Sequence, residues 1–371
     1  MSPILPTRRP NAIRGRQNRL STARILKYCI LALLGLLLYG MHDQLNVFTT
    51  VFRRIPNTLN SQPSEARGRN NLNSLTNGIG TAPKDNGSQE TLNFISTSPT
   101  TQYPKFGKCT ASFGDPDPPY EAAIASHALH NEIYGYPHFI LREHMIRGLW
   151  SKHGWIMTII GQELAKPAEQ RLQWLLWHDR DTVLMNPQIP LDIFVPPDPE
   201  FSHIHLLVTN DRNGLNNGVF MVRVNQWAFK LFASALSIRE YQPEIVLKYT
   251  EQSGMEEAIK RPWWASSVAY VPQRWFNGFP PDIENAGDNN RAHSREGSLL
   301  IHFASNRDGL RPERMAHWGE IARNRTSTWE KPVDQTLYQE EIAEFWKRMG
   351  KGESYDKINK DIGGRTWSIS K

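Results

Sequence analysis

The stretch Trp174–Pro187, WLLWHDRDTVLMNP, predicts both the type of fold and the place of a site. Trp174 to Trp177 is a short apolar run, which is typical of a strand buried on both faces. Asp179 and Asp181 follow almost at once. In an open α/β sheet, ligands bind where buried strands end. Two carboxylates at positions i and i+2 there can both reach one divalent cation, Mg²⁺ or Mn²⁺.

An Asp-x-Asp pair alone is weak evidence, because such pairs commonly belong to solvated turns or helix caps. The chain has a second pair, Asp115 and Asp117, which lies between a glycine and two prolines and is better interpreted as a loop. The pair at Asp179 and Asp181 differs because an apolar run leads into it. Only this pair is therefore a candidate metal site.

The amino-terminal part of this 371-residue chain, whose net charge is +6, predicts a membrane anchor. Residues 1–24 carry arginines and no acid, and residues 25–41 are apolar apart from one lysine and two tyrosines. That length is near the lower limit for crossing a bilayer. The basic side stays cytosolic, so we expect a cytosolic tail, a retained signal anchor at 25–41 and a lumenal remainder rather than a nucleic-acid-binding protein. A cleaved signal peptide is the alternative, but no good small-residue cleavage site follows.

Residues 42–104 are rich in Asn, Ser, Thr, Gly and Pro without periodicity, and they predict a flexible stem. Glycosylation sequons begin at Asn86 and Asn324. The two cysteines, Cys29 and Cys109, fall on different sides of the expected membrane boundary. We therefore expect no intrachain disulfide, and the folded domain must be held by its core.

Beyond the stem, strand and helix patterns alternate, which predicts an α/β domain. A strand that begins at Lys108 and ends in a glycine turn at Gly114, a helix at 120–134 and a strand at 137–141 suggest a parallel βαβ unit. The loop near Ser112 to Gly114 is a candidate binding site for a nucleotide. Segment 142–152 fits a helix or a loop, and 155–160 is a short apolar segment. Further strands are expected at 174–177, 205–209, 219–222, 268–272 and 298–304, and further helices at 227–237, 251–260 and 337–349.

Three later segments could contribute to a sugar site. Asn213-Gly214 and Asn217-Gly218 predict turns with positive φ whose amides could bind hydroxyls, although a simple tight loop explains them equally well. Trp275–Phe279 could form an aromatic platform for a sugar ring, although such clusters are more often core. His302 ends an apolar strand and is a candidate metal ligand, and Arg307 would suit a diphosphate.

These blocks, in this order, resemble glycosyltransferase family 34, the fungal and plant galactosyl-, mannosyl- and xylosyltransferases, over roughly Lys108 to Glu320. The matching blocks are Trp174–Pro187, Asn213–Arg223, Glu251-Gln252, Phe276-Asn277 and Ile301–Ala304. The family consists of type II membrane proteins with a lumenal GT-A domain, which is a Rossmann-like nucleotide-sugar-binding fold. The resemblance thus implies a GT-A domain at 105–330, followed by a carboxyl-terminal helix and a polar tail at 331–371.

The resemblance also implies a role for each matched residue. Asp179, Asp181 and His302 would hold the metal, Asn216, Asn217 and Gly218 would form the donor-sugar loop, Glu251 and Gln252 would lie near the anomeric carbon, and Arg307 stands where the family often has a diphosphate-binding lysine. The chain departs from the family at Arg180, usually a small or apolar residue, at His178, usually leucine, and at Ser253-Gly254 and Ser305-Asn306. The metal ligands themselves are retained.

The sequence therefore predicts a metal-dependent glycosyltransferase of the Golgi or ER membrane, of the α-1,2-galactosyltransferase or α-mannosyltransferase type. It would move galactose or mannose from UDP-galactose or GDP-mannose to an N- or O-linked glycan or a cell-wall polysaccharide, and the resemblance implies that the configuration is retained. Other Golgi glycosyltransferases are candidate partners.

Two alternatives stay open. One is a transferase-like subunit that binds glycans or partner chains without turnover. The other is a haloacid-dehalogenase-like phosphatase with Asp179 as nucleophile and Asp181 as acid and base. That fold also needs a downstream lysine and a later acidic pair at a strand end, and Gly287-Asp288 lies in a polar stretch instead.

Overall fold

The computed structural model describes residues 103–281, 292–304 and 306–363. The expected tail at 1–24, the anchor at 25–41 and nearly all of the stem at 42–104 lie outside this range. Cys29, the Asn86 sequon and Gly287-Asp288 lie outside it too. Within the described ranges, no helix combines the length and the apolar character needed to cross a bilayer.

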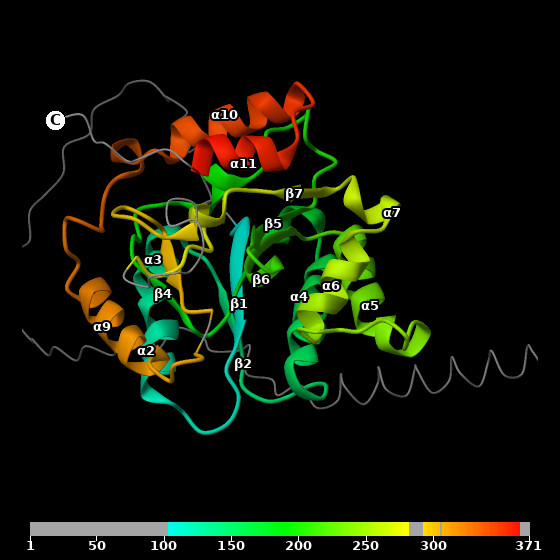
Figure 1. The fold of residues 1–371 in the computed structure, drawn as a ribbon, viewed down its shortest axis with the longest axis horizontal. Helices are drawn as coiled ribbons and strands as arrows, with labels where there is room; N and C mark the ends of the chain where they lie inside the picture. The colour runs from blue at the N-terminus through cyan, green and yellow to red at the C-terminus, as the bar shows by residue number, and fades with distance from the viewer. Residues whose placement is uncertain (1–102, 282–291, 305, 364–371) are drawn as a thin grey trace, which may run out of the picture. The chain divides into compact units, whose positions relative to one another are not determined.

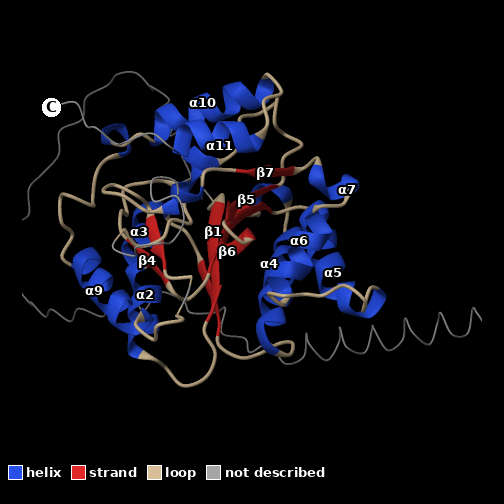
Figure 2. Cartoon of the chain, in the orientation of Figure 1, coloured by secondary structure: helices blue, strands red, loops and turns tan. Residues whose placement is uncertain are grey.

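A mixed six-stranded sheet forms the centre of the described domain (Figures 1 and 2). Its strands, in spatial order, are β2 (His138–Leu141), β1 (Phe106–Ala111), β3 (Trp174–His178), β6 (Gly214–Arg223), β5 (Leu206–Asp211) and β7 (Val268–Tyr270). β1 is parallel to both of its neighbours, β6 is antiparallel to both of its own, and β7 is parallel to β5. The expected α/β class and the parallel strand–helix–strand unit are confirmed.

A second, two-stranded sheet pairs β4 (Thr182–Leu184) with β8 (Leu300–His302) in antiparallel register. The chain passes from β3 in the large sheet to β4 in the small one through Asp179, Arg180 and Asp181. Thr182 is the register partner of His302. The small sheet therefore brings the imidazole, more than a hundred residues away in sequence, to the two acids.

The burial of β3 follows from its composition. All of its residues are buried, and neighbouring residues of a strand face opposite sides of the sheet. Trp174 and Leu176 belong to one hydrophobic core, while Leu175 and Trp177 belong to another. Fully burying side chains of this size stabilises the fold by about 1.5–3 kcal/mol each. A run that is apolar at every position is thus what a strand between two cores requires.

Helices cover both faces of the large sheet (Figure 1). One core packs against α4 (Ser151–Leu164), α5 (Gln226–Tyr241) and α6 (Glu251–Ile259). The opposite core receives α10 (Tyr338–Gly350) and α11 (Tyr355–Gly363). A third cluster joins the small sheet to α2 (Pro118–Ser126) and α9 (Arg311–Arg323). The other helical elements are α3 (Ala128–Tyr134), α7 (Pro262–Ala265) and 3-10 turns at Gly148–Trp150, Ala168–Gln170, Leu191–Phe194, Gln273–Trp275 and Val333–Gln335.

Several helices differ from the sequence-based expectation. The helix expected at 120–134 is two helices, α2 and α3, and the Ser126 hydroxyl near the break donates to the carbonyl of Ala123 at 2.6 Å. Such a bond competes with helix continuation. The apolar segment at 155–160 lies inside α4. In the expected polar tail, α11 buries Ile358 and Ile362, four residues apart, among charged neighbours that hid the pattern.

Candidate active site

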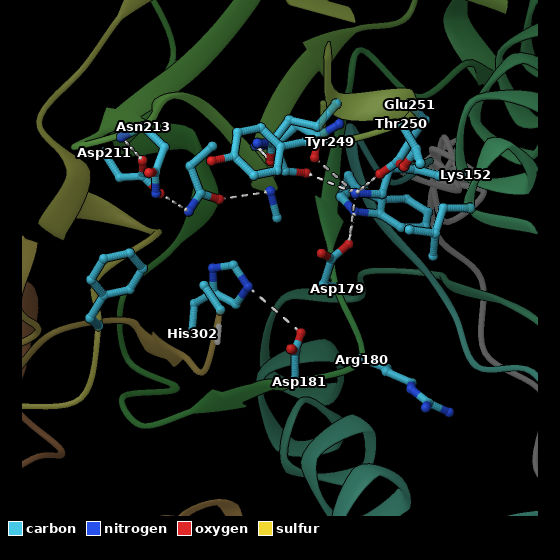
Figure 3. A pocket seen from close by; sticks show the side chains of 18 of the residues that line it. Lys152, Asp179, Arg180, Asp181, Asp211, Asn213, Tyr249, Thr250, Glu251 and His302 are labelled. Carbon is cyan, nitrogen blue, oxygen red and sulfur yellow. Dashed lines mark hydrogen bonds and ion pairs between the residues drawn. The ribbon is translucent and has the colours of Figure 1, made fainter. Parts of the chain in front are cut away.

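The link from β3 to β4 carries two of three clustered ligand groups (Figure 3). One carboxylate oxygen from each of Asp179 and Asp181 and one ring nitrogen of His302 all lie within 4.8 Å of one another. His302 Nε2 is 3.6 Å from Asp181 Oδ1. Two carboxylates and an imidazole form a donor set that suits Mn²⁺ and other borderline divalent ions. The structure thus brings the three expected ligands together, and they fit a divalent metal.

Gly218 allows this cluster to form. It was expected in a turn with positive φ, but it lies inside β6, whereas Gly214 has a φ of 105°. A Cβ on Gly218 would overlap the His302 ring. The carbonyl of Gly218 accepts a hydrogen bond from the Asp179 amide at 2.7 Å. Glycine is therefore required here by close contact with the imidazole and not by backbone conformation.

A cavity of about 970 Å³ opens beside the cluster. Of the residues expected in a site, Asp179, Asp181, His302, Asn216, Asn217, Gly218, Glu251, Gln252 and Arg307 line it. Ser112 and Gly114 do not, and their neighbours Ala111 and Phe113 line it instead. The end of β1 thus contributes a wall, but the Ser112 hydroxyl is directed at Glu121, 3.4 Å away.

Lys152, which the sequence analysis did not single out, connects three parts of this site (Figure 3). It lies near the start of α4 and is buried. Its Nζ is 3.0 Å from Asp179 Oδ1 and 3.2 Å from Glu251 Oε1. It also donates to the carbonyl and to the side-chain Oδ1 of Asn217, at 3.2 and 3.1 Å. Asp179, Asn217 and Glu251, from three separate segments, therefore share one ammonium group.

The charges of this network follow from burial and pairing. Burial opposes the charged form of Lys152, but the charges of Asp179 and Glu251 prevail and raise its pKa above the ordinary value. Burial likewise opposes the ionised form of Glu251, but the charge of Lys152 and the Thr250 hydroxyl hold its pKa below the ordinary value. Both groups are therefore charged near neutral pH.

The two aspartates differ in their pKa values. Burial raises the pKa of Asp179, and the charge of Lys152 only partly offsets this effect. Burial acts on Asp181 in the same direction, but the hydrogen bond and charge of His302, together with the charge of Arg311, hold its pKa below the ordinary value. Two neighbouring carboxylates with divergent pKa values are typical of a functional site.

Arginines line the same cavity as Asp181. Arg311 Nη1 lies 2.9 Å from Asp181 Oδ2, and Arg307 is exposed on the same wall. Arg180, the unusual residue between the acids, turns toward the loop after β1, with its guanidinium 4.1 Å from the centre of the Tyr120 ring and Nη1 3.4 Å from the Phe113 carbonyl. It therefore does not displace the three metal ligands.

The acid–amide pair begins α6, where a carboxylate is favoured by the helix dipole. Glu251 accepts a hydrogen bond from the Thr250 hydroxyl at 2.6 Å. Gln252 Oε1 accepts one from the Asn217 amide at 3.2 Å. The pair is thus fixed against the donor-sugar loop.

The expected aromatic platform is wrong for two of its members. Trp275 and Phe276 are fully buried and pack against Phe194 in the core. Only Phe279 of the three aromatic residues lines the cavity. The alternative interpretation, that aromatic clusters belong to the hydrophobic core, is therefore correct for Trp275 and Phe276.

Residues 196–308 match the model of the galactosyl transferase GMA12/MNN10 family. The chain is 25% identical over 244 residues to the uncharacterized alpha-1,2-galactosyltransferase C637.06 of Schizosaccharomyces pombe, covering 54% of this chain and 67% of that protein. It is 26% identical over 161 residues to the probable alpha-1,6-mannosyltransferase MNN10 of Saccharomyces cerevisiae, covering 36% of this chain and 41% of that protein.

One solved structure with a similar course of the chain is a glycosyltransferase involved in the glycosylation of the major capsid of PBCV-1. It is 16% identical to this chain, the match covers 58% of this chain and 100% of that chain, and the TM-score is 0.43. Another is the galactosyltransferase LgtC, with 14% identity, 62% and 98% covered, and a TM-score of 0.38.

Proposed function

We propose that this chain, whose residues 196–308 match the galactosyl transferase GMA12/MNN10 family, moves an α-linked hexose from a nucleotide sugar to a glycan, with a divalent metal held by Asp179, Asp181 and His302. The observation that carries the proposal is the clustering of these three ligands on the wall of one cavity, where Lys152 contacts both Asp179 of the cluster and Glu251 of the acid–amide pair. The bound metal, Mn²⁺ or Mg²⁺, would supply positive charge against the departing diphosphate.

The protein's own cations would bind the same leaving group. Arg311, which contacts Asp181, and Arg307 both line the cavity. A guanidinium suits phosphate oxygens because it can donate two parallel hydrogen bonds. Arg311 is held by Asp181, so it is already oriented before a donor arrives. Preorganised charge of this kind is generally the largest contribution to such catalysis.

The donor sugar would occupy the space between the donor-sugar loop and α6. Glu251 is ionised, pairs with Lys152 and accepts a hydrogen bond from Thr250. These contacts occupy its carboxylate oxygens and make it a poor nucleophile. Gln252 is a neutral amide and cannot form a glycosyl ester. We therefore favour attack by the acceptor hydroxyl on the face that the diphosphate leaves. The bond from C1 to the phosphate oxygen breaks, the bond from C1 to the acceptor oxygen forms, and the hydroxyl proton passes to the leaving phosphate.

We also propose that the chain works on the lumenal side of the Golgi or ER membrane, with residues 25–41 as its anchor. The support is the sequence alone, namely the basic tail followed by an apolar stretch. The donor is UDP-galactose or GDP-mannose, since the similar proteins bear the names of galactosyltransferases and a mannosyltransferase.

The two alternatives have less support. A haloacid-dehalogenase-like phosphatase needs a lysine after its aspartates, whereas the lysine that contacts Asp179 precedes it in the chain. A subunit without turnover has no need of a clustered metal-ligand set beside a cavity, and that set is retained here.

A transfer assay tests this function. The full chain would be incubated with Mn²⁺ and either UDP-galactose or GDP-mannose, and release of UDP or GDP would be measured with and without oligosaccharide acceptors. We expect one donor to be consumed, and Asp179→Asn to lose roughly 100-fold or more in rate, as removal of a charge-stabilising group does elsewhere. Asp117→Asn, in the second Asp-x-Asp pair, is the matched control and should remain active. Equal rates for the two variants would contradict the proposal.

A further inference from the structure

We propose that Asn277 is a positioning residue for the metal site: it fixes the ring orientation and tautomer of His302, so that Nε2 carries the free lone pair toward Asp179 and Asp181. The inference deepens the proposed function and rests on it, because the metal gives this orientation its purpose. Asn277 is fully buried and is not among the residues that line the cavity. It would therefore act through His302 and not on the substrate.

The backbone of Asn277 is held in place by the turn that precedes it. Its amide donates to the carbonyl of Gln273 at 2.9 Å. The side chain of Gln273 donates in return to the carbonyl of Asn277 at 3.2 Å. The backbone position from which the Asn277 side chain extends is therefore fixed, and the direction of the side chain depends only on its own χ angles.

The hydrogen-bond partners settle which end of the Asn277 amide faces the imidazole. Its Nδ2 lies 2.7 Å from Thr209 Oγ1, 3.2 Å from the Asn216 carbonyl, 3.1 Å from Asn216 Oδ1 and 3.4 Å from the Val219 carbonyl. Asn216 Oδ1 is itself fixed as an oxygen, because it accepts from the Gly218 amide at 3.0 Å. The Thr209 hydroxyl could donate to a flipped Asn277, but the other three oxygens are acceptors only, and a flipped side chain would set its own oxygen against them. The NH₂ group must therefore face these oxygens.

The oxygen of Asn277 consequently faces His302, with Oδ1 2.7 Å from Nδ1. A carbonyl oxygen can only accept, so Nδ1 must carry the proton of the imidazole. In its neutral form, the ring therefore has its lone pair on Nε2, and Nε2 lies 3.6 Å from Asp181 Oδ1. Histidines that bind metals commonly donate their other ring N–H to an oxygen in this way, and loss of that partner typically lowers metal affinity 10–100-fold.

Two further contacts keep the ring in this position. The His302 amide donates to the carbonyl of Gly278 at 2.8 Å. On the other side, the absence of a side chain on Gly218 admits the ring against β6. The imidazole is thus placed by the backbone and by Gly218, while Asn277 decides which nitrogen faces the metal.

The first test reads the tautomer without any metal. The full chain would be labelled with ¹⁵N-histidine and treated with a chelator, and its ring nitrogens would be observed by NMR, with His302→Gln to identify the signal. The spectra would be recorded at a pH high enough for the ring to be neutral. There we expect a protonated Nδ1 and an unprotonated Nε2 in the parent, and loss of this preference in Asn277→Ala. A neutral parent His302 with its only proton on Nε2 would overturn the inference. The tautomer measured in this way tests the role of Asn277 even if the proposed transferase function fails.

The second test measures Mn²⁺ affinity by electron paramagnetic resonance of the free ion. Asn277→Ala should bind Mn²⁺ about 10–100-fold more weakly. Asn186→Ala is the matched control, since Asn186 is equally buried and its Nδ2 donates to the carbonyls of Gly297 and Lys331, away from the cavity lining.

Thermal unfolding would be recorded for every variant, because Asn186→Ala is expected to lose stability but not Mn²⁺ affinity. Equal Mn²⁺ affinity in Asn277→Ala and Asn186→Ala would show that Asn277 is only structural. If the parent bound no Mn²⁺ at all, the proposed function would fail, and the tautomer would still decide the role of Asn277.

Discussion

Lys152 on α4 lies 3.0 Å from Asp179 and 3.2 Å from Glu251. One buried ammonium therefore holds together the Asp179–Asp181 link and the acid–amide pair Glu251-Gln252. Each of these carboxylates would be left without its principal counter-charge if Lys152 were absent. The site is thus assembled by a residue from a third element, which neither the Asp-x-Asp stretch nor the Glu251-Gln252 block contains.

Replacing Lys152 by methionine should therefore destabilise the fold as well as the site. Breaking one side of a buried ion pair generally costs about 3–5 kcal/mol, because the remaining charge stays buried. Urea unfolding in the absence of metal would measure this loss. Lys331→Met is the control: Lys331 is also largely buried, but its partner Glu296 is 58% exposed, so we expect a loss under about 1 kcal/mol. Equal losses would show that Lys152 does not bind the two acids together.

Gly218→Ala should separate His302 from the aspartates. The added Cβ would overlap the imidazole ring, which lies against buried β6. Overpacking of this kind costs about 1–3 kcal/mol, and we expect Mn²⁺ affinity to fall as the ring moves. Gly319→Ala on α9 meets no atom within 4 Å and should leave stability and Mn²⁺ affinity unchanged or slightly improved. A Gly218→Ala chain with parental Mn²⁺ affinity would refute the assignment of His302.

Arg311→Gln should weaken binding of the diphosphate. Arg311 lines the cavity and contacts Asp181, whereas Arg323, in the last turn of the same helix, is exposed. We expect Arg311→Gln to lose roughly 100-fold in kcat/KM for the nucleotide sugar, as groups that stabilise developing charge do. Steady-state kinetics of both variants would measure the difference. Arg323→Gln should match the parent, and an equal effect in the two variants would point to a general change in charge.

The free energy of unfolding should fall as the pH drops below 6.5, because the folded chain holds histidines in the neutral form by burial. Burial lowers the pKa of His138 from 6.5 to about 3, with smaller effects from the charges of Lys108 and Arg142. The unfolded chain takes up this proton below pH 6.5 and the folded chain does not. Stability is therefore complete above the unfolded pKa and is lost as the pH falls toward 3, by about 1.4 kcal/mol per pH unit for each such histidine.

Denaturant unfolding between pH 6.5 and pH 5 measures this slope, in a range where carboxylates with low pKa values stay ionised. His138→Gln should reduce the slope by up to about 1.4 kcal/mol per pH unit. His317→Gln, on the exposed face of α9, should leave it as in the parent. A parental slope in His138→Gln would contradict the neutral buried state.

The sequence predicted the parts of the site that adjoin buried strands. The apolar run before Asp179 marked a strand end, and His302 ended another apolar run, so both could be identified without knowing their distance. The assignment of Ser112 and Gly114 missed the cavity because β1 ends at Ala111 and the Ser112 hydroxyl is directed at Glu121; Ala111 and Phe113 line the cavity instead.

Other features could not be predicted, because they depend on tertiary contacts. Lys152 carries no local signal, since a lysine near the start of an apolar helix is ordinarily exposed, and only the approach of Asp179 and Glu251 explains its burial. Asn277 stood in a block taken for an aromatic platform. Its contact with His302 links the segment after the 3-10 turn Gln273–Trp275 to β8, and the sequence does not pair these two segments. Helix α11 buries two isoleucines among charges, a pattern too sparse to predict it.

The central claim, a metal-dependent nucleotide-sugar site, is tested most directly by calorimetric titration of the full chain with UDP and with GDP, each with and without Mn²⁺. Asp181→Ala is the matched variant, since Asp181 is one of the three clustered ligands. The account predicts that one of the two nucleotides binds only when Mn²⁺ is present, and that Asp181→Ala abolishes this binding while the chain stays folded. Failure of both nucleotides to bind the folded parent in the presence of Mn²⁺ would contradict it.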